Sequence, residues 1–288
     1  MSALPEAAAA GGEAGVIVRA VVARVAFYAF VAVISTFFAL PLLWLLLAPF
    51  DRNPTLAVEP PSWTLSNFAD VLDNPLALTS LRNSLVLSLG TMALVVVFAA
   101  LAAYALSRVR LPGRDLLLYV LLLFSSVVTG AAAMVPIFLL IFDLGMINTY
   151  TGVVLVLSGG LLPAAIFILK DFMDAMPRSY EESARVFGAS SFQVLRDVVT
   201  PVVRPGLAVI AVWTIVNVWG NFLIPFILLR DPDKAPASVV IYNFYTESGQ
   251  ADLHVLSAFS LLYSIPVVVM YLFVNRRYGF RFHGGIKR

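Results

Sequence analysis

The stretch Ser84–Leu106, SLVLSLGTMALVVVFAALAAYAL, contains no Asp, Glu, Lys, Arg or His along its whole length. A helix needs about 20 predominantly apolar residues to cross the hydrocarbon core of a bilayer, and this stretch is long enough. The rest of the chain is similar, because 60% of its 288 residues are hydrophobic and 12% are charged, against about 25% charged residues in soluble domains. The stretch therefore predicts a transmembrane helix in a membrane protein.

Further apolar runs of comparable length lie on both sides of this stretch: Val25–Ala48, Leu116–Phe142, Thr151–Leu169, Gly206–Leu229 and Val255–Val274. Together the runs predict an all-α membrane protein in which six transmembrane helices form one bundle. We divide the chain into a disordered, cytoplasmic N-terminal segment (1–24), the six-helix domain (25–275, including a polar loop at 170–205) and a cytoplasmic tail (276–288).

The distribution of basic residues predicts the orientation, since cytoplasmic loops of membrane proteins are enriched in Lys and Arg. With the N-terminus inside, the outer side holds only Arg52, Arg82, Arg230 and Lys234 of the 19 basic residues. The inner side holds Arg19, Arg24, Arg108, Arg110, Arg114, Lys170, Arg178, Arg185, Arg196, Arg204, Arg276, Arg277, Arg281, Lys287 and Arg288. We therefore expect both termini in the cytoplasm.

Several classes of function find no support in the sequence. The chain has no cysteine and no phosphate-binding G-x-x-x-x-G-K-[ST] loop, and its net charge of +2 does not indicate a nucleic-acid partner. His254 and His283 are its only histidines and are predicted to lie on opposite sides of the membrane. We expect no metal site, no bound cofactor and no catalytic residues in this chain.

The polar loop contains the segment Ser179–Pro205, SYEESARVFGASSFQVLRDVVTPVVRP. Ser179 and Glu182 have the spacing of a capping box, which predicts a helix that begins here and ends at Gly188 in a left-handed conformation. A second short helix is predicted to begin near Ser190 or Ser191 and to be broken by Pro201. The segment therefore predicts a helix–turn–helix at the cytoplasmic face.

This helix pair could lie on the lipid surface or dock into another protein. The small residues Ala184, Gly188 and Ala189 favour a protein groove, because they allow another backbone to approach closely.

The same segment resembles the "EAA loop" of permease subunits of binding-protein-dependent ABC importers. The matching positions are Glu182, Ala184, Gly188, Ala189, Phe192, Pro201 and Pro205, whereas Ser183, Phe187 and Thr200 depart from the usual pattern. AYALSRVRLPGRD (103–115) and VWGNFLIPFIL (218–228) also resemble segments of this family, with Gly220 in place of the usual Asn. The outer-loop pattern PSWTLSNFADVL and the GGIKR tail are similar to the second permease subunit of maltose-type carbohydrate importers.

The resemblance implies the type I permease fold with a cytoplasmic coupling helix pair, in the plasma (inner) membrane of a bacterium. It also implies a homologous second permease, two ATP-binding subunits that hold ATP and magnesium, and a solute-binding protein that is periplasmic or lipid-anchored. The residues that would contact an ATP-binding subunit are Glu181, Glu182, Ala184, Arg185, Phe187, Gly188, Ala189 and Phe192.

Solute contacts are predicted on the fifth span, where Trp213, Asn217 and Asn221 are spaced to share one helical face. Asn side chains can donate to and accept from hydroxyl groups, and Trp offers an apolar platform for the C–H face of a sugar. Tyr263 is a further candidate on the sixth span. The alternative is that these polar residues bind neighbouring helices, which is common in membranes.

The resemblance thus predicts ATP-driven sugar import by alternating access. A glycerol-phosphate or glycerophosphodiester importer of the same architecture, a secondary transporter and a non-transporting membrane scaffold remain alternatives. The apolar spans contain no Asp, Glu, Lys, Arg or His, which argues against a proton-driven carrier.

Overall fold

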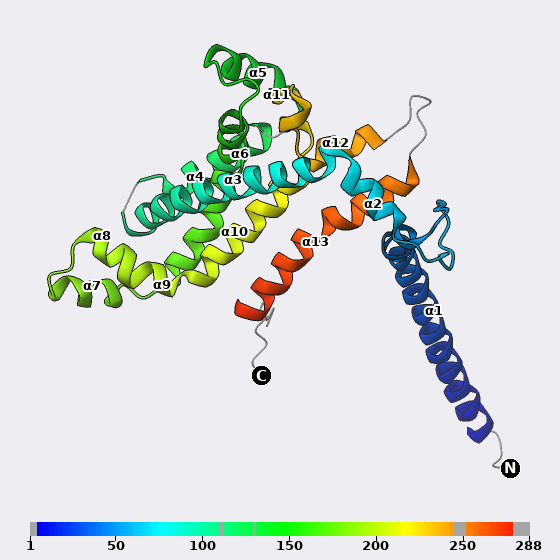
Figure 1. Ribbon diagram of the computed structural model, residues 1–288. Helices are drawn as coiled ribbons and strands as arrows, with labels where there is room; N and C mark the ends of the chain where they lie inside the picture. The colour runs from blue at the N-terminus through cyan, green and yellow to red at the C-terminus, as the bar shows by residue number, and fades with distance from the viewer. Residues whose placement is uncertain (1–4, 110–111, 129–130, 245–251, 279–288) are drawn as a thin grey trace.

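The computed structural model describes residues 5–109, 112–128, 131–244 and 252–278. Apart from an isolated β-bridge between Asp51 and Trp63, the regular elements of these residues are all helical, as predicted. Figure 1 shows several long helices that cross one another, short helices at both ends of this bundle, and α1 reaching away from it.

Four helices among the described residues are long and apolar enough to cross a membrane: α1 (Pro5–Leu47), α3 (Pro75–Arg108), α6 (Tyr150–Asp174) and α13 (Leu253–Tyr278). The bent pair Ser191–Val202 and Arg204–Trp219 could supply a fifth span. The apolar run Leu116–Phe142, predicted as one span, is divided between α4 (Arg114–Val128) and α5 (Met134–Asp143), and residues 129–130 lie outside the described residues. A count of six spans therefore stays a prediction.

Apart from α10, the second helix of the bent pair, the remaining elements are short and connect or flank these helices. In chain order they are η1 (Ala48–Phe50), α2 (Ser66–Asp73), η2 (Ala131–Ala133), α7 (Ser179–Val186), α8 (Ser191–Gln193), the π-helical turn η3 (Val194–Val199), α9 (Thr200–Val202), α10 (Arg204–Trp219), α11 (Leu223–Leu228), η4 (Pro232–Lys234), α12 (Ala237–Val240) and η5 (Ile241–Phe244).

The first helix begins earlier than predicted, at Pro5, so residues 5–24 are helical where the sequence predicted an irregular segment. Alanine, which recurs over residues 7–10, has the highest intrinsic helix propensity. The apolar part of α1 buries none of its residues against the rest of the chain. This helix therefore leaves its apolar surface available to lipid or to another protein.

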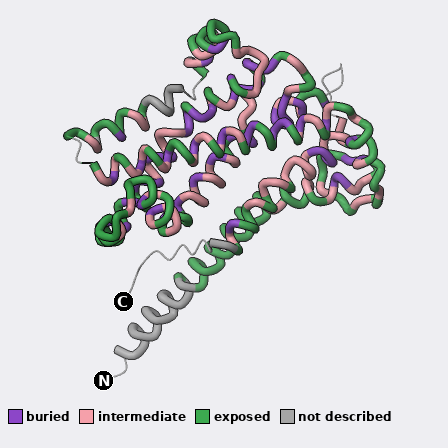
Figure 2. Tube along the Cα trace, turned by 60° about the vertical axis from the view of Figure 1, so that its left-hand side comes forward, coloured by how far each residue is buried: buried purple, intermediate pink, exposed green. Residues whose placement is uncertain are grey.

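The core lies where α3, α6 and α10 pack together. Leu87 and Val95 of α3, Leu157 and Leu169 of α6 and Ile210 of α10 are buried there. Figure 2 shows buried positions distributed along the helices of the bundle. Burying apolar side chains inside such a bundle gains little hydrophobic free energy in lipid, so close packing has to hold the helices together.

The break between α9 and α10 is at Val203, and the helical stretches on its two sides are bent by 78°. The prediction that Pro201 breaks the preceding helix is therefore wrong. Pro201 instead lies within the continuous helical stretch Ser191–Val202, directly after the π-helical turn η3, and the helix ends one residue beyond it. Pro205 lies in the first turn of α10, where a helix tolerates proline because the N–H group that proline lacks has no partner there in any case.

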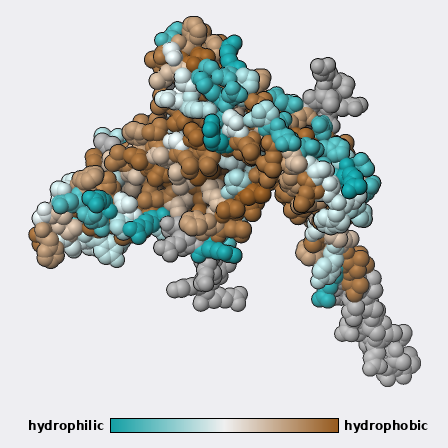
Figure 3. Space-filling model, viewed as in Figure 1, coloured by the Kyte–Doolittle hydropathy of each residue, from teal (hydrophilic) through white to brown (hydrophobic). Residues whose placement is uncertain are grey.

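A second, smaller cluster of buried side chains joins α2, α12 and α13 at the other end of the bundle, around Val71, Val240 and Phe259. Asn67 of α2 is also buried, and its side-chain amide donates to the carbonyl oxygens of Pro49 at 3.1 Å and Asp51 at 2.8 Å. Figure 3 shows hydrophilic residues gathered at both ends of the molecule and hydrophobic residues between them, as a bundle that spans a bilayer requires.

Candidate functional site

The helix pair formed by α7 and α8 is the candidate site, and its first helix begins differently from the prediction. Arg178 is the N-cap residue and makes no side-chain capping bond, and Ser179 is already the first helical residue. The predicted Ser179–Glu182 capping box is therefore wrong. The backbone of Arg178 is helical, so Ser179 lies one position too late to cap the helix.

The turn between the two helices agrees with the prediction. Gly188 has a φ of 84°, in the left-handed region that glycine adopts without a steric penalty. Its N–H donates to the carbonyl of Arg185 at 2.9 Å, and the N–H of Ala189 donates to that of Ala184 at 3.1 Å. These two bonds form a Schellman motif, which satisfies carbonyls at the end of α7 and reverses the chain.

The second helix carries the capping box. The N–H of Gln193 donates to Ser190 Oγ at 3.3 Å, and Gln193 Oε1 accepts from the N–H of Ser190 at 2.8 Å. The predicted start near Ser190 or Ser191 is confirmed, because Ser190 is the N-cap of α8. A tight turn between two short helices with satisfied ends holds the tip of the pair in a defined shape.

The tip of the helix pair exposes large apolar side chains. Phe187 is 91% exposed, Val186 is 83% exposed and Phe192 is 68% exposed. The charged side chains of Glu182 and Arg185 are exposed beside them. We call these five residues the tip surface. A protein rarely leaves such a group in water, and apolar side chains rimmed by charge are typical of a protein–protein contact.

Two of the residues predicted for docking point elsewhere. Ala184 and Ala189 are half-buried and pack against the core cluster, so of the three small residues only Gly188 is exposed. Val186 was not singled out in the sequence, although a valine before Phe187 on an otherwise polar helix was a usable signal. The two alanines thus allow the helix pair to pack closely against the bundle of its own chain.

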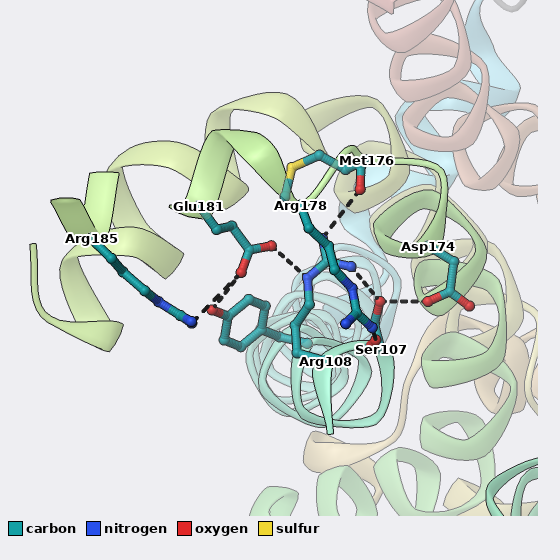
Figure 4. A network of polar contacts seen from close by, with 8 residues as sticks. Ser107, Arg108, Asp174, Met176, Arg178, Glu181 and Arg185 are labelled. Atoms are coloured by element: carbon teal, nitrogen blue, oxygen red, sulfur yellow. Dashed lines mark hydrogen bonds and ion pairs between the residues drawn. The ribbon is translucent and has the colours of Figure 1, made fainter. Parts of the chain in front are cut away.

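Glu181, also predicted to dock, is buried with 3% of its surface exposed. Its Oε1 accepts from Arg108 Nε at 2.5 Å and its Oε2 accepts from the hydroxyl of Tyr104 at 3.1 Å. Arg185 Nη2 lies 3.9 Å from the same Oε2. Figure 4 shows the carboxylate directed away from the tip and toward the last turn of α3.

The last turn of α3 contacts the end of α6 as well. Ser107 Oγ donates to Asp174 Oδ1 at 2.5 Å, and Lys170 Nζ lies 2.6 Å from the other carboxylate oxygen of Asp174. The side chain of Arg178 donates to the carbonyl of Ser107 at 3.4 Å. Charged groups bonded in this way are about twice as strongly held as neutral ones.

The residues predicted to contact solute do not form one helical face. Helix α10 ends at Trp219, so Asn221 lies beyond it and accepts from the N–H of Ile224 at the start of α11. Asn217 is exposed and donates to the carbonyl of Trp213 at 2.8 Å. Tyr263 donates from its hydroxyl to the carbonyl of Trp219 at 2.6 Å. The expected spacing fails because the helix is interrupted at Gly220, and solute contact by these residues stays a prediction.

No group of three or more His, Cys, Asp or Glu residues that could hold a metal ion occurs in the described part of the chain. The ring nitrogen Nδ1 of His254 lies 3.2 Å from Asn67 Oδ1, and His283 lies outside the described residues.

The comparisons with known proteins agree with one another. A family model described as a binding-protein-dependent transport system inner membrane component matches residues 95–280. The chain is 29% identical over 258 residues to the maltodextrin transport system permease protein MdxG of Bacillus subtilis, covering 88% of this chain and 92% of that one. It is 30% identical over 256 residues to the galactooligosaccharides transport system permease protein GanQ of the same organism, covering 87% and 89%.

Among solved structures, a chain of a bacterial ABC transporter involved in the import of the acidic polysaccharide alginate has the same fold. The TM-score is 0.73 at 22% identity, and the superposition covers 92% of this chain and 97% of that one.

Proposed function

Because the chain belongs to the family of binding-protein-dependent transport system inner membrane components, we propose that it is one of two permease subunits of an ATP-driven sugar importer. It is a multi-pass protein of the bacterial inner membrane. We propose further that six helices span that membrane, that both termini are cytoplasmic, and that the bundle alternates between outward-facing and inward-facing states.

The tip surface carries this proposal. It combines large exposed apolar side chains with charges on a helix pair, and its sequence resembles the EAA loop of permeases that ATP-binding subunits drive. Phe187, at 91% exposed, has the form of an anchor residue that a pocket on a partner would enclose. The partners are then two ATP-binding subunits, which hold ATP and magnesium, a second permease and an extracytoplasmic solute-binding protein.

A sugar is the favoured solute because similarity to the oligosaccharide permeases extends along about nine tenths of the chain. Glycerol-phosphate or glycerophosphodiester import has no comparable support. A secondary transporter would not need ATP, so the energy source separates that alternative from the proposal.

The test uses the complete complex in proteoliposomes with its binding protein and labelled maltodextrins or galactooligosaccharides. We expect uptake that requires ATP and survives an ionophore. Uptake that persists without ATP and collapses with the ionophore would favour the secondary transporter, and a complex that takes up neither sugar class would contradict the sugar assignment.

The docking role of the tip surface is tested by Phe187→Ala. We expect the fraction of ATP-binding subunit that co-purifies with the permease to fall by about tenfold or more, because removing an anchor side chain from an interface costs on the order of 2 kcal/mol. Folding should be unaffected, since Phe187 is almost fully exposed. The matched control is Leu56→Ala, which removes another exposed apolar side chain, 82% exposed, from the predicted outer loop. Equal co-purification of both variants would remove the docking assignment.

A further inference from the structure

Glu181 differs from the rest of the helix to which it belongs. The other residues of α7 are exposed or half-buried, whereas Glu181 has 3% of its surface exposed. Its carboxylate is bonded to Arg108 and Tyr104, which are both on α3 and lie more than 70 positions away in the sequence. A buried carboxylate needs such partners, because an unpaired charge in the interior is very costly.

The bonds of Arg108 extend this contact. Its Nε binds Glu181, its Nη1 donates to Ser107 Oγ at 3.0 Å and its Nη2 donates to the carbonyl of Met176 at 3.5 Å. One guanidinium group therefore connects α7, the α6–α7 connection and the last turn of α3 (Figure 4). The guanidinium fork is rigid, so it fixes the direction of the contact as well as its length.

The position of α3 in the bundle gives this contact its importance. Helix α3 packs against both α6 and α10, and these three helices form the core. A displacement of α3 would therefore act on the core as a whole. The helix pair also meets the core through apolar contacts of Ala184, Ala189 and Val194, and its own chain continues into α10 through a backbone that is sharply bent at Val203.

From this geometry we propose that the Arg108–Glu181 pair, supported by Tyr104, makes α7 and α3 move as one unit, and that Glu181 is a positioning residue for coupling and not a docking residue. This inference rests on the proposed function, because it assumes that an ATP-binding subunit displaces the tip surface. The tip surface receives the displacement, and the buried ion pair carries it into α3.

The two roles separate experimentally. Glu181→Gln removes the charge and keeps nearly the same shape, so we expect co-purification with the ATP-binding subunit and ATP hydrolysis to persist. Solute transported per ATP hydrolysed should fall by about tenfold, a typical size for the coupling between two sites. Phe187→Ala, in contrast, should lose co-purification. The matched control is Asp171→Asn, which neutralises an exposed carboxylate at the end of α6 and should leave the ratio unchanged.

A charge exchange tests the pair itself. We expect Arg108→Glu and Glu181→Arg each to uncouple transport from hydrolysis, and the double variant to regain a large part of the transport ratio. Only variants with the thermal stability of the wild type are compared. If a variant with a single reversed charge does not fold, the transport ratio of Glu181→Gln tests the inference instead. Unchanged coupling in Glu181→Gln, loss of co-purification in that variant, or a double variant as uncoupled as the singles would each overturn the inference. A wild-type complex without ATP-dependent uptake would instead contradict the proposed function.

Discussion

Asn83 shows how one buried polar side chain fixes the end of the bundle opposite the helix pair. It is 1% exposed, and its amide donates to the carbonyl oxygens of Asp233 at 2.8 Å and Ala235 at 3.1 Å. The side-chain oxygen Oδ1 of Asn83 accepts from the hydroxyl of Tyr150 at 2.9 Å. A single residue thus connects α3, α6 and the loop that follows α11.

Replacing Asn83 with alanine should lower stability markedly. The change leaves two carbonyls and a tyrosine hydroxyl without their partner, and each such group costs about 1–3 kcal/mol when it stays buried. Thermal unfolding in detergent measures the effect. Asn53→Ala is the matched control, because Asn53 is exposed and only its backbone N–H makes a bond, to Asp51. Equal unfolding temperatures for the two variants would contradict the role assigned to Asn83.

At the scale of the helices, the crossing of α6 and α10 depends on Gly206. A Cβ atom at this position would lie 2.6 Å from Cγ of Phe172, far inside van der Waals contact. Cβ of Phe172, whose position the backbone fixes, would also lie only 3.0 Å away, so a change of the Phe172 rotamer alone would not remove the close contact. The first turn of α10 can therefore approach α6 only because residue 206 lacks a side chain.

Gly206→Ala should destabilise the bundle by about 1–3 kcal/mol, as overpacking does. The double variant Gly206→Ala/Phe172→Ala should cost less than the sum of the two single changes, because the second change makes room for the added methyl group. Unfolding midpoints of the four proteins measure this coupling. Gly159→Ala serves as the control, since a Cβ there would have no atom within 4 Å. Strict additivity would show that the clash is relieved in another way.

For the molecule as a whole, the long exposed α1 suits a chain that functions in an assembly. Its apolar helical part, residues 21–47, contains no buried residue, and Figure 1 shows it directed away from the other helices. In the proposed importer this surface faces lipid and the second permease. The end that carries the tip surface and the end around Asn83 then lie on opposite sides of the membrane.

Labelling of introduced cysteines tests this topology, because the wild-type chain has no cysteine and gives no background. We expect Leu56→Cys to react with an impermeant maleimide in intact cells, since Leu56 is 82% exposed in the predicted outer loop. Arg196→Cys, whose parent side chain is 74% exposed, should react only after permeabilisation. Labelling of Arg196→Cys in intact cells would contradict the cytoplasmic position of the helix pair.

The sequence alone determined the features that depend on neighbouring residues. The runs Ser84–Leu106 and Thr151–Leu169 lie within single helices, because a helix in lipid satisfies its backbone bonds locally. Gly188 forms the predicted left-handed turn, since only the backbone conformation of that residue is involved. The motif spacing around it identified the family.

The tertiary structure decided the features that depend on residues far apart in the chain. Burial of Glu181 requires Arg108, and the role of Asn83 requires the carbonyls of Asp233 and Ala235. The sequence predicted a break at Pro201, whereas the bend of 78° lies at Val203, which is buried in the core. Local sequence patterns indicate backbone conformation, because that depends on neighbouring residues. The partner of a buried charge comes from a distant helix, so only the tertiary structure identifies it.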